Sequence, residues 1–180
     1  MIKVINVIGA RPNYMKVAPL HKRMQQDVDF KPLLVHTGQH YGQMMSDIFL
    51  SQLGKLTPDY YLNVGSNTHA RQTAEIMIKF EEVLDKEKPD LVVVVGDVNS
   101  TLACALVAVK KQIRVAHVEA GLRSFDLTMP EEYNRKIVDH LADFLFTPSA
   151  DGDDNLLKEG IERDKIFQVG NIMIDSLIMF

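Results

Sequence analysis

The stretch LVVVVGDVNST, residues 91–101, decides the fold class. Its first part, Leu91–Val95, consists of apolar and mostly β-branched residues, which favour a strand. Apolar and polar side chains do not alternate here, and this indicates a strand that is buried on both faces. Such strands are typical of parallel sheets that helices cover on both sides. The polar residues that follow place Asp97 at the end of this strand, next to the start of a helix.

Short β-branched strands alternate with helical patterns along most of the chain. The predicted strands are Val4–Ile8, Leu33–Val35, Leu91–Val95, Val115–Val118, Phe144–Phe146 and Phe167–Val169. Between them, segments such as residues 69–88 place apolar side chains at the spacing of one helix face. This alternation predicts an α/β fold, a doubly wound parallel sheet with right-handed crossovers. Pro19 lies within the first helical pattern, so we expect that helix either to kink or to restart there.

The composition is that of a globular protein with one domain. The chain has 180 residues, of which 46% are hydrophobic and 24% charged, enough for a sizeable core. A formal net charge of -4 argues against binding to nucleic acid or to anionic membranes. The single cysteine, Cys104, cannot form an internal disulfide, which favours a reducing cytoplasm. No apolar run reaches the roughly 18 residues of a transmembrane helix.

The C-terminal residues 170–180, GNIMIDSLIMF, are apolar and have no glycine stop and no charged tail. An apolar end of this kind is expected to face a partner surface. The sequence therefore predicts that this chain is the front part of a longer protein.

Polar, turn-rich segments follow the predicted strands, and in an open parallel sheet ligands bind beyond the carboxyl ends of the strands. The first of these segments, GARPN at residues 9–13, is neither G-x-G-x-x-G nor a Walker A loop, so a dinucleotide cofactor is not favoured. Arg11 and Lys16 beside this glycine turn suit an anionic ligand at a helix start. A tight turn with two solvated cations would have the same sequence, and spacing alone does not decide between the two interpretations.

Two carboxylates at strand ends are candidates for acid–base chemistry. Asp97 is either functional or a solvated turn residue, with Asn99 or Ser100 as the cap of the following helix. Glu119 ends an apolar strand, where rigid backbone can hold and desolvate a carboxylate for proton transfer.

A third carboxylate, Glu131, also fits a structural role. Thr128-Met-Pro-Glu131 matches a capping box with Thr128 as the N-cap, and spacing alone favours this role. Arg135 lies one turn after Glu131 and one turn before Asp139, so an i,i+4 ion pair is available. Arg123, in the preceding turn, is either a surface cation or a phosphate clamp.

The histidines do not predict a metal site. His36 and His40 flank a turn, and no cysteine or carboxylate completes a set of ligands. The chain also has no G-x-S-x-G nucleophile elbow.

Seven segments of the chain together form a pattern that is more specific than any one of them. They are GARPNYMKVAPL, HTGQHY, THARQT, GDVNST, HVEAGLRSFD, MPEEYNR and VGNIMIDSL. In this order and spacing they resemble the non-hydrolysing UDP-N-acetylglucosamine 2-epimerase family. The resemblance runs from residue 9 to about residue 177, and seven segments in register are specific although each alone is weak.

The resemblance implies a GT-B-like fold of two Rossmann-like domains with the active site in the cleft between them. Family members are much longer, so the chain resembles the N-terminal domain, residues 1–170, followed at 171–180 by the start of the crossover to a missing C-terminal domain. Activity of the isolated chain is therefore not expected. A homodimer, a cytoplasmic location and a role in cell-envelope polysaccharide biosynthesis are also implied.

The family's reaction inverts C2 of UDP-N-acetylglucosamine (UDP-GlcNAc) to give UDP-N-acetylmannosamine (UDP-ManNAc). UDP is eliminated with the C2 proton to give 2-acetamidoglucal, and UDP then adds back while a proton reaches the other face of C2. No redox cofactor is needed. The matching catalytic positions are Asp97, Glu119 and Glu131, and the matching substrate-binding positions are Arg11, Lys16 and Arg135. Neighbouring carboxylates take different pKa values, which sets acid and base roles, but the sequence does not assign them.

Bacterial family members bind a second UDP-GlcNAc molecule as an allosteric activator. The matching positions here are Gln39, His40, Gln43 and Arg71. The segment GQHYGQMM is one residue longer than the activator-site pattern, so Gln43 is the weakest match.

Three further functions are compatible with the same segments. Several of them also resemble relatives that epimerise 3-amino or uronic UDP-sugars. A hydrolysing 2-epimerase would release free N-acetylmannosamine instead of UDP-ManNAc. A sugar-nucleotide binding module would hold the ligand without turnover.

Overall fold

The strands form one parallel sheet. The computed structural model describes residues 1–38 and 56–179. Within these residues the strands are β1 (Ile2–Ile8), β2 (Phe30–His36), β3 (Tyr60–Tyr61), β4 (Leu91–Val95), β5 (Arg114–Val118), β6 (Phe144–Thr147) and β7 (Ile166–Gln168). All neighbouring strands pair in parallel, in the order β3-β2-β1-β4-β5-β6-β7. The predicted doubly wound sheet is confirmed.

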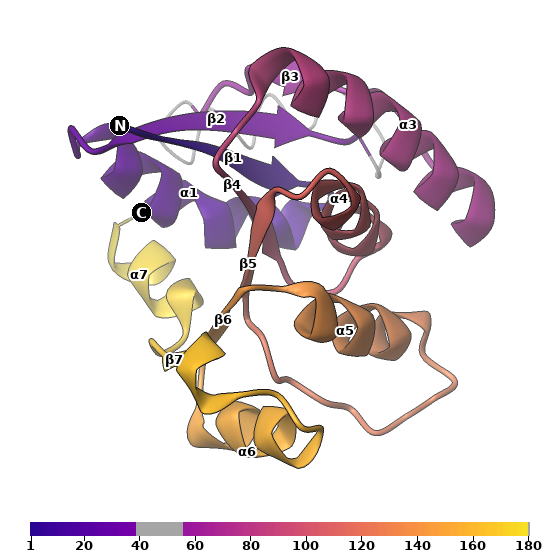
Figure 1. The fold of residues 1–180 in the computed structure, drawn as a ribbon, viewed down its shortest axis with the longest axis vertical. Coiled ribbons are helices and arrows are strands. Elements are labelled where there is room, and N and C mark those ends of the chain that lie inside the picture. Colours follow the sequence, from indigo (N-terminus) through magenta and orange to yellow (C-terminus); the bar gives the residue numbers. More distant parts are fainter. Residues whose placement is uncertain (39–55, 180) are drawn as a thin grey trace.

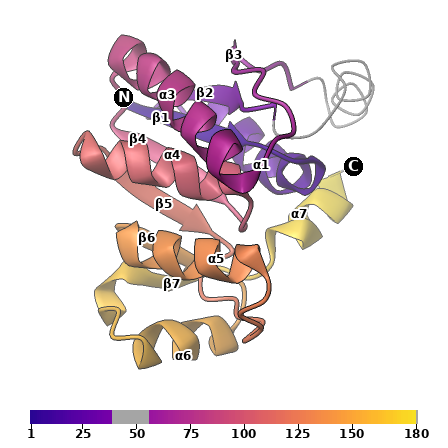
Figure 2. The ribbon, with the colours of Figure 1, turned by 90° about the vertical axis from the view of Figure 1, so that its right-hand side faces the viewer.

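Helices cover both faces of this sheet. They are α1 (Arg11–Gln25), α3 (His69–Glu87), α4 (Asn99–Lys110), α5 (Pro130–Leu141), α6 (Ala150–Lys158) and α7 (Ile172–Met179), with a 3-10 turn η1 (Arg163–Lys165) before β7. Figures 1 and 2 show α3, α4 and α5 side by side over one face, whereas α1 and α7 lie on the other. The α/β layers predicted from the alternating pattern are therefore present.

Strand β4 is buried on both faces, as its unbroken apolar run predicts. Val92 and Val94 belong to the core under α3, α4 and α5, where Phe80 of α3 is fully buried. Val93 and Val95 belong to the second core under α1. Because the side chains of a strand alternate between faces, β4 contributes to both cores at once.

Several element boundaries differ from the prediction. Strand β1 begins at Ile2 rather than Val4, and β7 ends at Gln168. Strand β3, Tyr60–Tyr61, was not predicted because two residues are too short to show a period. Helix α1 runs through Pro19 to its end, so it does not restart there.

The sheet order reverses between β1 and β4. Strands β2 and β3 lie on one side of this point and β5, β6 and β7 lie on the other. The segments that follow β1 and β4 therefore leave the sheet in opposite directions and open a crevice at their carboxyl ends. This switch point is where the fold offers a ligand site.

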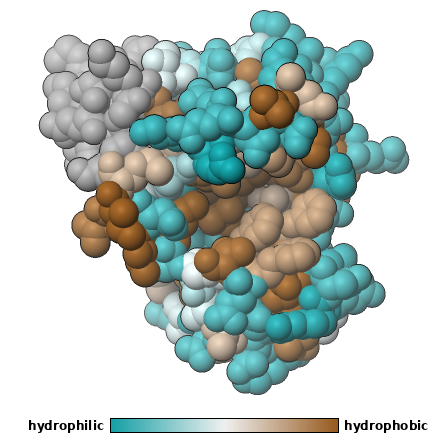
Figure 3. Space-filling view, turned by 90° about the vertical axis from the view of Figure 1, so that its left-hand side faces the viewer, coloured by the Kyte–Doolittle hydropathy of each residue, from teal (hydrophilic) through white to brown (hydrophobic). Residues whose placement is uncertain are grey.

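Helix α7 exposes apolar side chains. Leu177 is 81% exposed and Ile178 is 80% exposed, although the helix packs against α1 and the Ser176 hydroxyl donates to the Met15 carbonyl. Figure 3 shows the face that carries α1 and α7, with apolar side chains gathered on it.

No helix in the described residues is both long enough and apolar enough to cross a membrane.

Candidate active site

The turn after β1 is held by Asn13, a buried residue in the first turn of α1. Its Oδ1 accepts hydrogen bonds from the amides of Gly9 and Ala10 at 3.3 and 2.9 Å, and its Nδ2 donates to the Val95 carbonyl at 3.0 Å. Asn13 thus joins the ends of β1 and β4 across the switch point. The helix turn that carries Lys16 is fixed against the end of β4 as a result.

Lys16 and Glu119 form an ion pair at this point. Lys16 Nζ donates to Glu119 Oε2, and the two side chains are only 16% and 12% exposed. Gly96, directly after β4, lies beside the pair, because a Cβ built on it would be 3.5 Å from Lys16 Nζ and 3.8 Å from Glu119 Oε2. Lys16 is therefore not a solvated cation of a tight turn.

The backbone of Glu119 is in the left-handed region, with φ of 68°, which non-glycine residues rarely adopt. The next residue holds the turn, because the Ala120 amide donates to the Phe146 carbonyl at 3.1 Å. Gly121 then packs so closely on α6 that an added Cβ would lie 2.4 Å from the Gly152 carbonyl oxygen. Strained positions that the surrounding structure enforces are concentrated at functional sites, which supports a functional role for Glu119.

Asp97 is bound by Arg135 of α5. Arg135 Nε and Nη2 donate to Asp97 Oδ2 at 2.9 and 2.5 Å, and its Nη1 donates to Glu132 Oε2 at 2.8 Å. The Asn134 side chain donates to the Asp97 carbonyl at 2.8 Å. Burial lowers the pKa of Arg135, but the two carboxylates more than offset this, so the pKa is raised overall. Helix α5 therefore restrains both the side chain and the backbone of Asp97.

Glu131 does not cap α5. The helix has Met129 as its N-cap without a side-chain cap, and the Thr128 hydroxyl donates to Asp126 at 2.7 Å instead. The predicted capping box is wrong because Asp126 takes the hydroxyl that would cap the helix. Glu131 itself is half-buried, and no described residue forms a hydrogen bond or an ion pair with its carboxylate.

The neighbouring Glu132 has a structural role of a different kind, because it binds the segment before the helix instead of capping the helix. Its fully buried carboxylate accepts hydrogen bonds from the Ser124 amide and hydroxyl at 2.9 Å each, from the Phe125 amide at 3.3 Å and from Arg135. Burial alone would raise the pKa of Glu132, but these donors outweigh it and hold the pKa at about 2. The available i,i+4 pair between Arg135 and Glu131 does not form, because other carboxylates occupy the guanidinium.

A buried chain of charged groups links β5 to α6. His117 Nδ1 contacts Asp139 Oδ1 at 2.6 Å, and His117 Nε2 donates to the Gly96 carbonyl at 2.8 Å. Asp139 Oδ2 accepts from Arg123 Nη1 at 2.8 Å. Arg123 Nε and Nη2 donate to the Glu159 carboxylate at 2.9 and 2.6 Å. We call His117, Asp139, Arg123 and Glu159 the His117–Glu159 charge chain. It contacts the turn that carries Asp97 through the Gly96 carbonyl.

The sequence left two roles open for Arg123, a surface cation and a phosphate clamp, and the structure supports neither of them. The side chain is completely buried in its contacts with Asp139 and Glu159. Burial lowers the pKa of Arg123, and the hydrogen bonds and charges of the two carboxylates raise it further than burial lowers it. Because Arg123 and His117 occupy Asp139, the available pair between Asp139 and Arg135 does not form.

Asn99 and Ser100 do not cap α4, so that prediction is also wrong. The N-cap is Val98, without a side-chain cap. The Asn99 side chain donates to Gln72 Oε1 at 2.8 Å, and Ser100 Oγ shares a hydrogen bond of 2.8 Å with Thr37 Oγ1. Contacts with other elements have taken both side chains away from the helix end.

The predicted activator site is only partly described. Outside the described part lie Gln39, His40, Gln43 and the side chain of Arg11. Arg71 is exposed in the first turn of α3, and its amide donates to the side chain of Thr68, the N-cap, at 3.4 Å.

The structure brings four of the predicted site residues together and places a fifth nearby. The four are Lys16, Asp97, Glu119 and Arg135. Glu131 lies one turn before Arg135 on α5. Such an edge combines carboxylates that can exchange protons with cations that can balance an anionic group. Sequence reasoning missed the residues that hold this edge, namely Asn13, His117, Glu132, Asn134 and Asp139.

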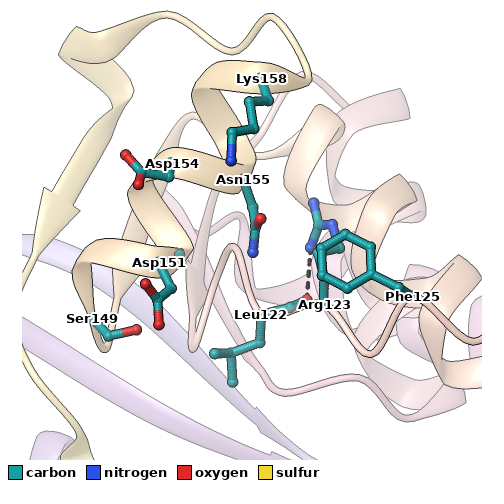
Figure 4. Close-up of a pocket in the computed structure, with 9 residues that line it drawn as sticks. Leu122, Arg123, Phe125, Ser149, Asp151, Asp154, Asn155 and Lys158 are labelled. Carbon is teal, nitrogen blue, oxygen red and sulfur yellow. Dashed lines mark hydrogen bonds between the residues drawn. The ribbon is translucent and has the colours of Figure 1, made fainter.

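A hollow of about 440 Å³ lies between the segment after β5 and helix α6. Figure 4 shows Leu122 and Phe125 on one side of it, with Asp151, Asp154 and Lys158 projecting from α6 on the other. Because acidic and basic side chains both line this hollow, its charge does not favour an anion.

Comparison with known proteins places these features in a family. A sequence model described as UDP-N-acetylglucosamine 2-epimerase matches residues 22–180. Over 177 residues the chain is 51% identical to a UDP-N-acetylglucosamine 2-epimerase homolog of Methanococcus maripaludis, covering 98% of this chain and 49% of that protein. It is 45% identical over 181 residues to the UDP-2,3-diacetamido-2,3-dideoxy-D-glucuronate 2-epimerase of Pseudomonas aeruginosa, covering 99% of this chain and 51% of that protein.

Solved structures agree with this comparison. The crystal structure of the Methanocaldococcus jannaschii UDP-GlcNAc 2-epimerase in complex with UDP-GlcNAc and UDP is 48% identical to this chain, with a TM-score of 0.95. The match covers 98% of this chain and 49% of that structure. The chain thus spans about half the length of the relatives it matches.

Proposed function

This chain belongs to the UDP-N-acetylglucosamine 2-epimerase family, and we propose that it forms the N-terminal half of an enzyme that interconverts UDP-GlcNAc and UDP-ManNAc. The observation that carries the proposal is the convergence of two ion pairs at the switch point of the sheet. They are Lys16–Glu119 and Arg135–Asp97. Each combines a carboxylate for proton transfer with a cation for a departing diphosphate.

The proposed reaction is an elimination followed by an addition. In the first step the C2–H bond and the C1–O bond to UDP break, a carboxylate takes the C2 proton, and a C1–C2 double bond forms in 2-acetamidoglucal. In the second step UDP bonds again to C1 while an acid delivers a proton to the opposite face of C2. The carbon skeleton returns to its original oxidation level, so the reaction needs no redox cofactor.

The carboxylates proposed for proton transfer are Asp97, Glu119 and Glu131. The backbone of Glu119 has a positive φ that restricts the direction of its side chain, and the ion pair with Lys16 holds its carboxylate in one place. Glu131 is half-buried and has no hydrogen-bond or ion-pair partner among the described residues, so its carboxylate is available to a substrate.

The cations proposed for the diphosphate are Lys16 and Arg135, together with Arg11 at the start of α1. Positive charge close to the leaving group stabilises the negative charge that develops as the C1–O bond breaks. Arg135 serves in addition to restrain Asp97, so a substrate diphosphate and Asp97 share one guanidinium.

We further propose that residues 1–170 form one Rossmann-like domain and that residues 171–180 begin the crossover to a C-terminal domain. The half-length match to the relatives and the exposed apolar side chains of α7 support this organisation. The whole protein is proposed to be a cytoplasmic homodimer that supplies cell-envelope polysaccharide synthesis. A second UDP-GlcNAc molecule is proposed to activate it through Arg71 and residues 39–43.

A proton NMR experiment in heavy water tests the function. The full-length protein and the 180-residue chain are incubated separately with UDP-GlcNAc, and deuterium at C2, UDP-ManNAc and free sugar are followed. Exchange and UDP-ManNAc are expected from the full-length protein and not from the chain alone. Free N-acetylmannosamine would indicate a hydrolysing enzyme, and an absence of C2 exchange with the full-length protein would refute the proposal.

A second candidate substrate follows from the Pseudomonas aeruginosa relative, which is named for a 2,3-diacetamido uronate and is 45% identical. The same assay with that UDP-sugar discriminates between the two. Turnover of the uronate at a higher kcat/KM than UDP-GlcNAc would transfer the assignment to the modified sugar.

A further inference from the structure

We propose that the buried His117–Asp139 pair positions the two turns that carry Asp97 and Glu119, and this inference rests on the proposed epimerase function. The pair belongs to the His117–Glu159 charge chain and touches neither the substrate crevice nor solvent. His117 is 0% exposed and Asp139 is 1% exposed. Its contribution is therefore to geometry, through the backbone groups that it binds.

The first of these backbone groups is the Gly96 carbonyl. His117 Nε2 donates to it at 2.8 Å, and Gly96 immediately precedes Asp97. The Asp97 carbonyl in turn accepts from Asn134 at 2.8 Å. Two consecutive carbonyls are thus fixed from β5 and α5, and the direction in which the Asp97 side chain leaves the backbone is fixed with them.

The second backbone group is the Gly121 amide. It donates to Asp139 Oδ2 at 3.0 Å, two residues after Glu119. Because Glu119 itself has a φ of 68°, its turn needs outside contacts to stay in that conformation. One carboxylate on α5 therefore holds the Glu119 turn while its histidine partner holds the Asp97 turn.

The hydrogen bonds define the protonation state of His117. The Gly96 carbonyl can only accept, so Nε2 must carry a proton. Asp139 Oδ2 accepts hydrogen bonds from Arg123 Nη1 at 2.8 Å and from the Gly121 amide at 3.0 Å, and these donors favour an ionised carboxylate. Nδ1 must then donate as well, which makes the ring an imidazolium with two N–H groups.

The rest of the charge chain keeps this imidazolium in place. Arg123 binds Asp139 on one side and the two oxygens of Glu159 on the other. The chain therefore alternates positive and negative groups and has no net charge. This alternation stabilises two cations and a carboxylate that would be costly to bury alone.

Two substitutions of His117 separate positioning from simple packing. In His117→Gln the side-chain amide reaches the position of Nε2 and can still donate to Gly96. In His117→Asn the amide reaches the position of Nδ1 and can donate only to Asp139. Both variants lose the buried imidazolium, so both lose stability. Only His117→Asn loses the hydrogen bond to the Asp97 turn.

We expect kcat of full-length His117→Asn to fall about 10–100-fold below that of His117→Gln, with similar KM for UDP-GlcNAc. The matched control is His140→Asn, because His140 is exposed at the end of α5 and its kcat is expected to stay at the wild-type value. Equal kcat values for the two His117 variants would overturn the proposal, since a packing role does not distinguish them.

Two further measurements test the proposal without relying on turnover of a particular sugar, and the first of them uses the wild-type chain. NMR of the 180-residue wild-type chain is expected to show a ring N–H signal from His117 Nε2 in slow exchange with water, and the absence of this signal would overturn the proposal. A crystal structure of His117→Asn is expected to show a rotated Gly96–Asp97 peptide, and an unchanged peptide would also overturn it. A wild-type full-length protein without C2 exchange would refute the proposed function instead.

Discussion

The pair Glu131 and Glu132 offers a direct test because adjacent carboxylates have opposite roles. We predict that Glu132→Gln destabilises the chain while Glu131→Gln does not. Glu132 is fully buried and accepts hydrogen bonds from Ser124, Phe125 and Arg135. The glutamine has nearly the same shape, so the change removes the charge and one acceptor without leaving a cavity.

The magnitude follows from the pKa of Glu132. Its pKa falls from the ordinary 4.5 to about 2 in the folded chain. At about 1.4 kcal/mol per pH unit, the ionised form contributes roughly 3 kcal/mol to folding relative to the neutral form. Glutamine resembles the neutral form, so we expect Glu132→Gln to lower the free energy of unfolding at pH 7 by about 3 kcal/mol.

Urea unfolding of the 180-residue chain at several pH values measures this loss. Because the folded pKa of Glu132 is depressed, its contribution is complete above pH 4.5 and disappears as the pH falls toward 2. The gap between wild type and Glu132→Gln should therefore close over that range. Glu131→Gln, the matched control, should stay within about 0.5 kcal/mol of wild type. A Glu132→Gln variant as stable as wild type at pH 7 would refute the reasoning.

Three further predictions concern backbone, pH and regulation. Gly121→Ala should lower the free energy of unfolding in urea by more than about 2 kcal/mol, because a Cβ would lie 2.4 Å from the Gly152 carbonyl oxygen. Gly160 also has a positive φ, of 85°, but an added Cβ there would meet open space, so Gly160→Ala should lower it by only about 1 kcal/mol. Equal losses would exclude the steric account. Burial lowers the pKa of His21 from 6.5, so the unfolded chain binds a proton at this position before the folded chain does as the pH falls. The free energy of unfolding should therefore decrease below pH 6.5. The His21→Asn variant should show a smaller decrease over the same pH range in urea unfolding. Because Arg71 is exposed, Arg71→Ala should change the free energy of unfolding by less than about 0.5 kcal/mol. The same change should weaken the activation of the full-length protein by UDP-GlcNAc. A large loss of stability would contradict the activator role.

The fold was predictable because its signals are local. The unbroken apolar run Leu91–Val95 and the period of residues 69–88 each lie within one element, and both were confirmed by the structure. Strand β3 was missed because Tyr60–Tyr61 is too short for any period. Capping was predicted wrongly at Thr128 and Asn99 because a nearby or distant partner competes with the helix end, and spacing does not reveal that competition.

The candidate site was only partly predictable because its contacts join residues far apart in the chain. Lys16 and Glu119 are 103 positions apart, and Arg135 lies 38 positions from Asp97. The parallel topology indicates which strand ends are neighbours, but it does not choose which cation pairs with which carboxylate. The roles themselves came from the resemblance, and they remain predictions.

The most direct test of the central claim is the rate of deuterium incorporation at C2 of UDP-GlcNAc by the full-length protein, compared between wild type and Glu119→Gln. The two proteins should have similar affinity for UDP. Both are assayed under conditions in which circular dichroism shows them folded, because breaking the largely buried Lys16–Glu119 pair also lowers stability. If Glu119 transfers the proton, the exchange rate should fall by about 10²–10⁴. An exchange rate close to wild type would show that the carboxylates at the switch point of this sheet do not carry out the chemistry.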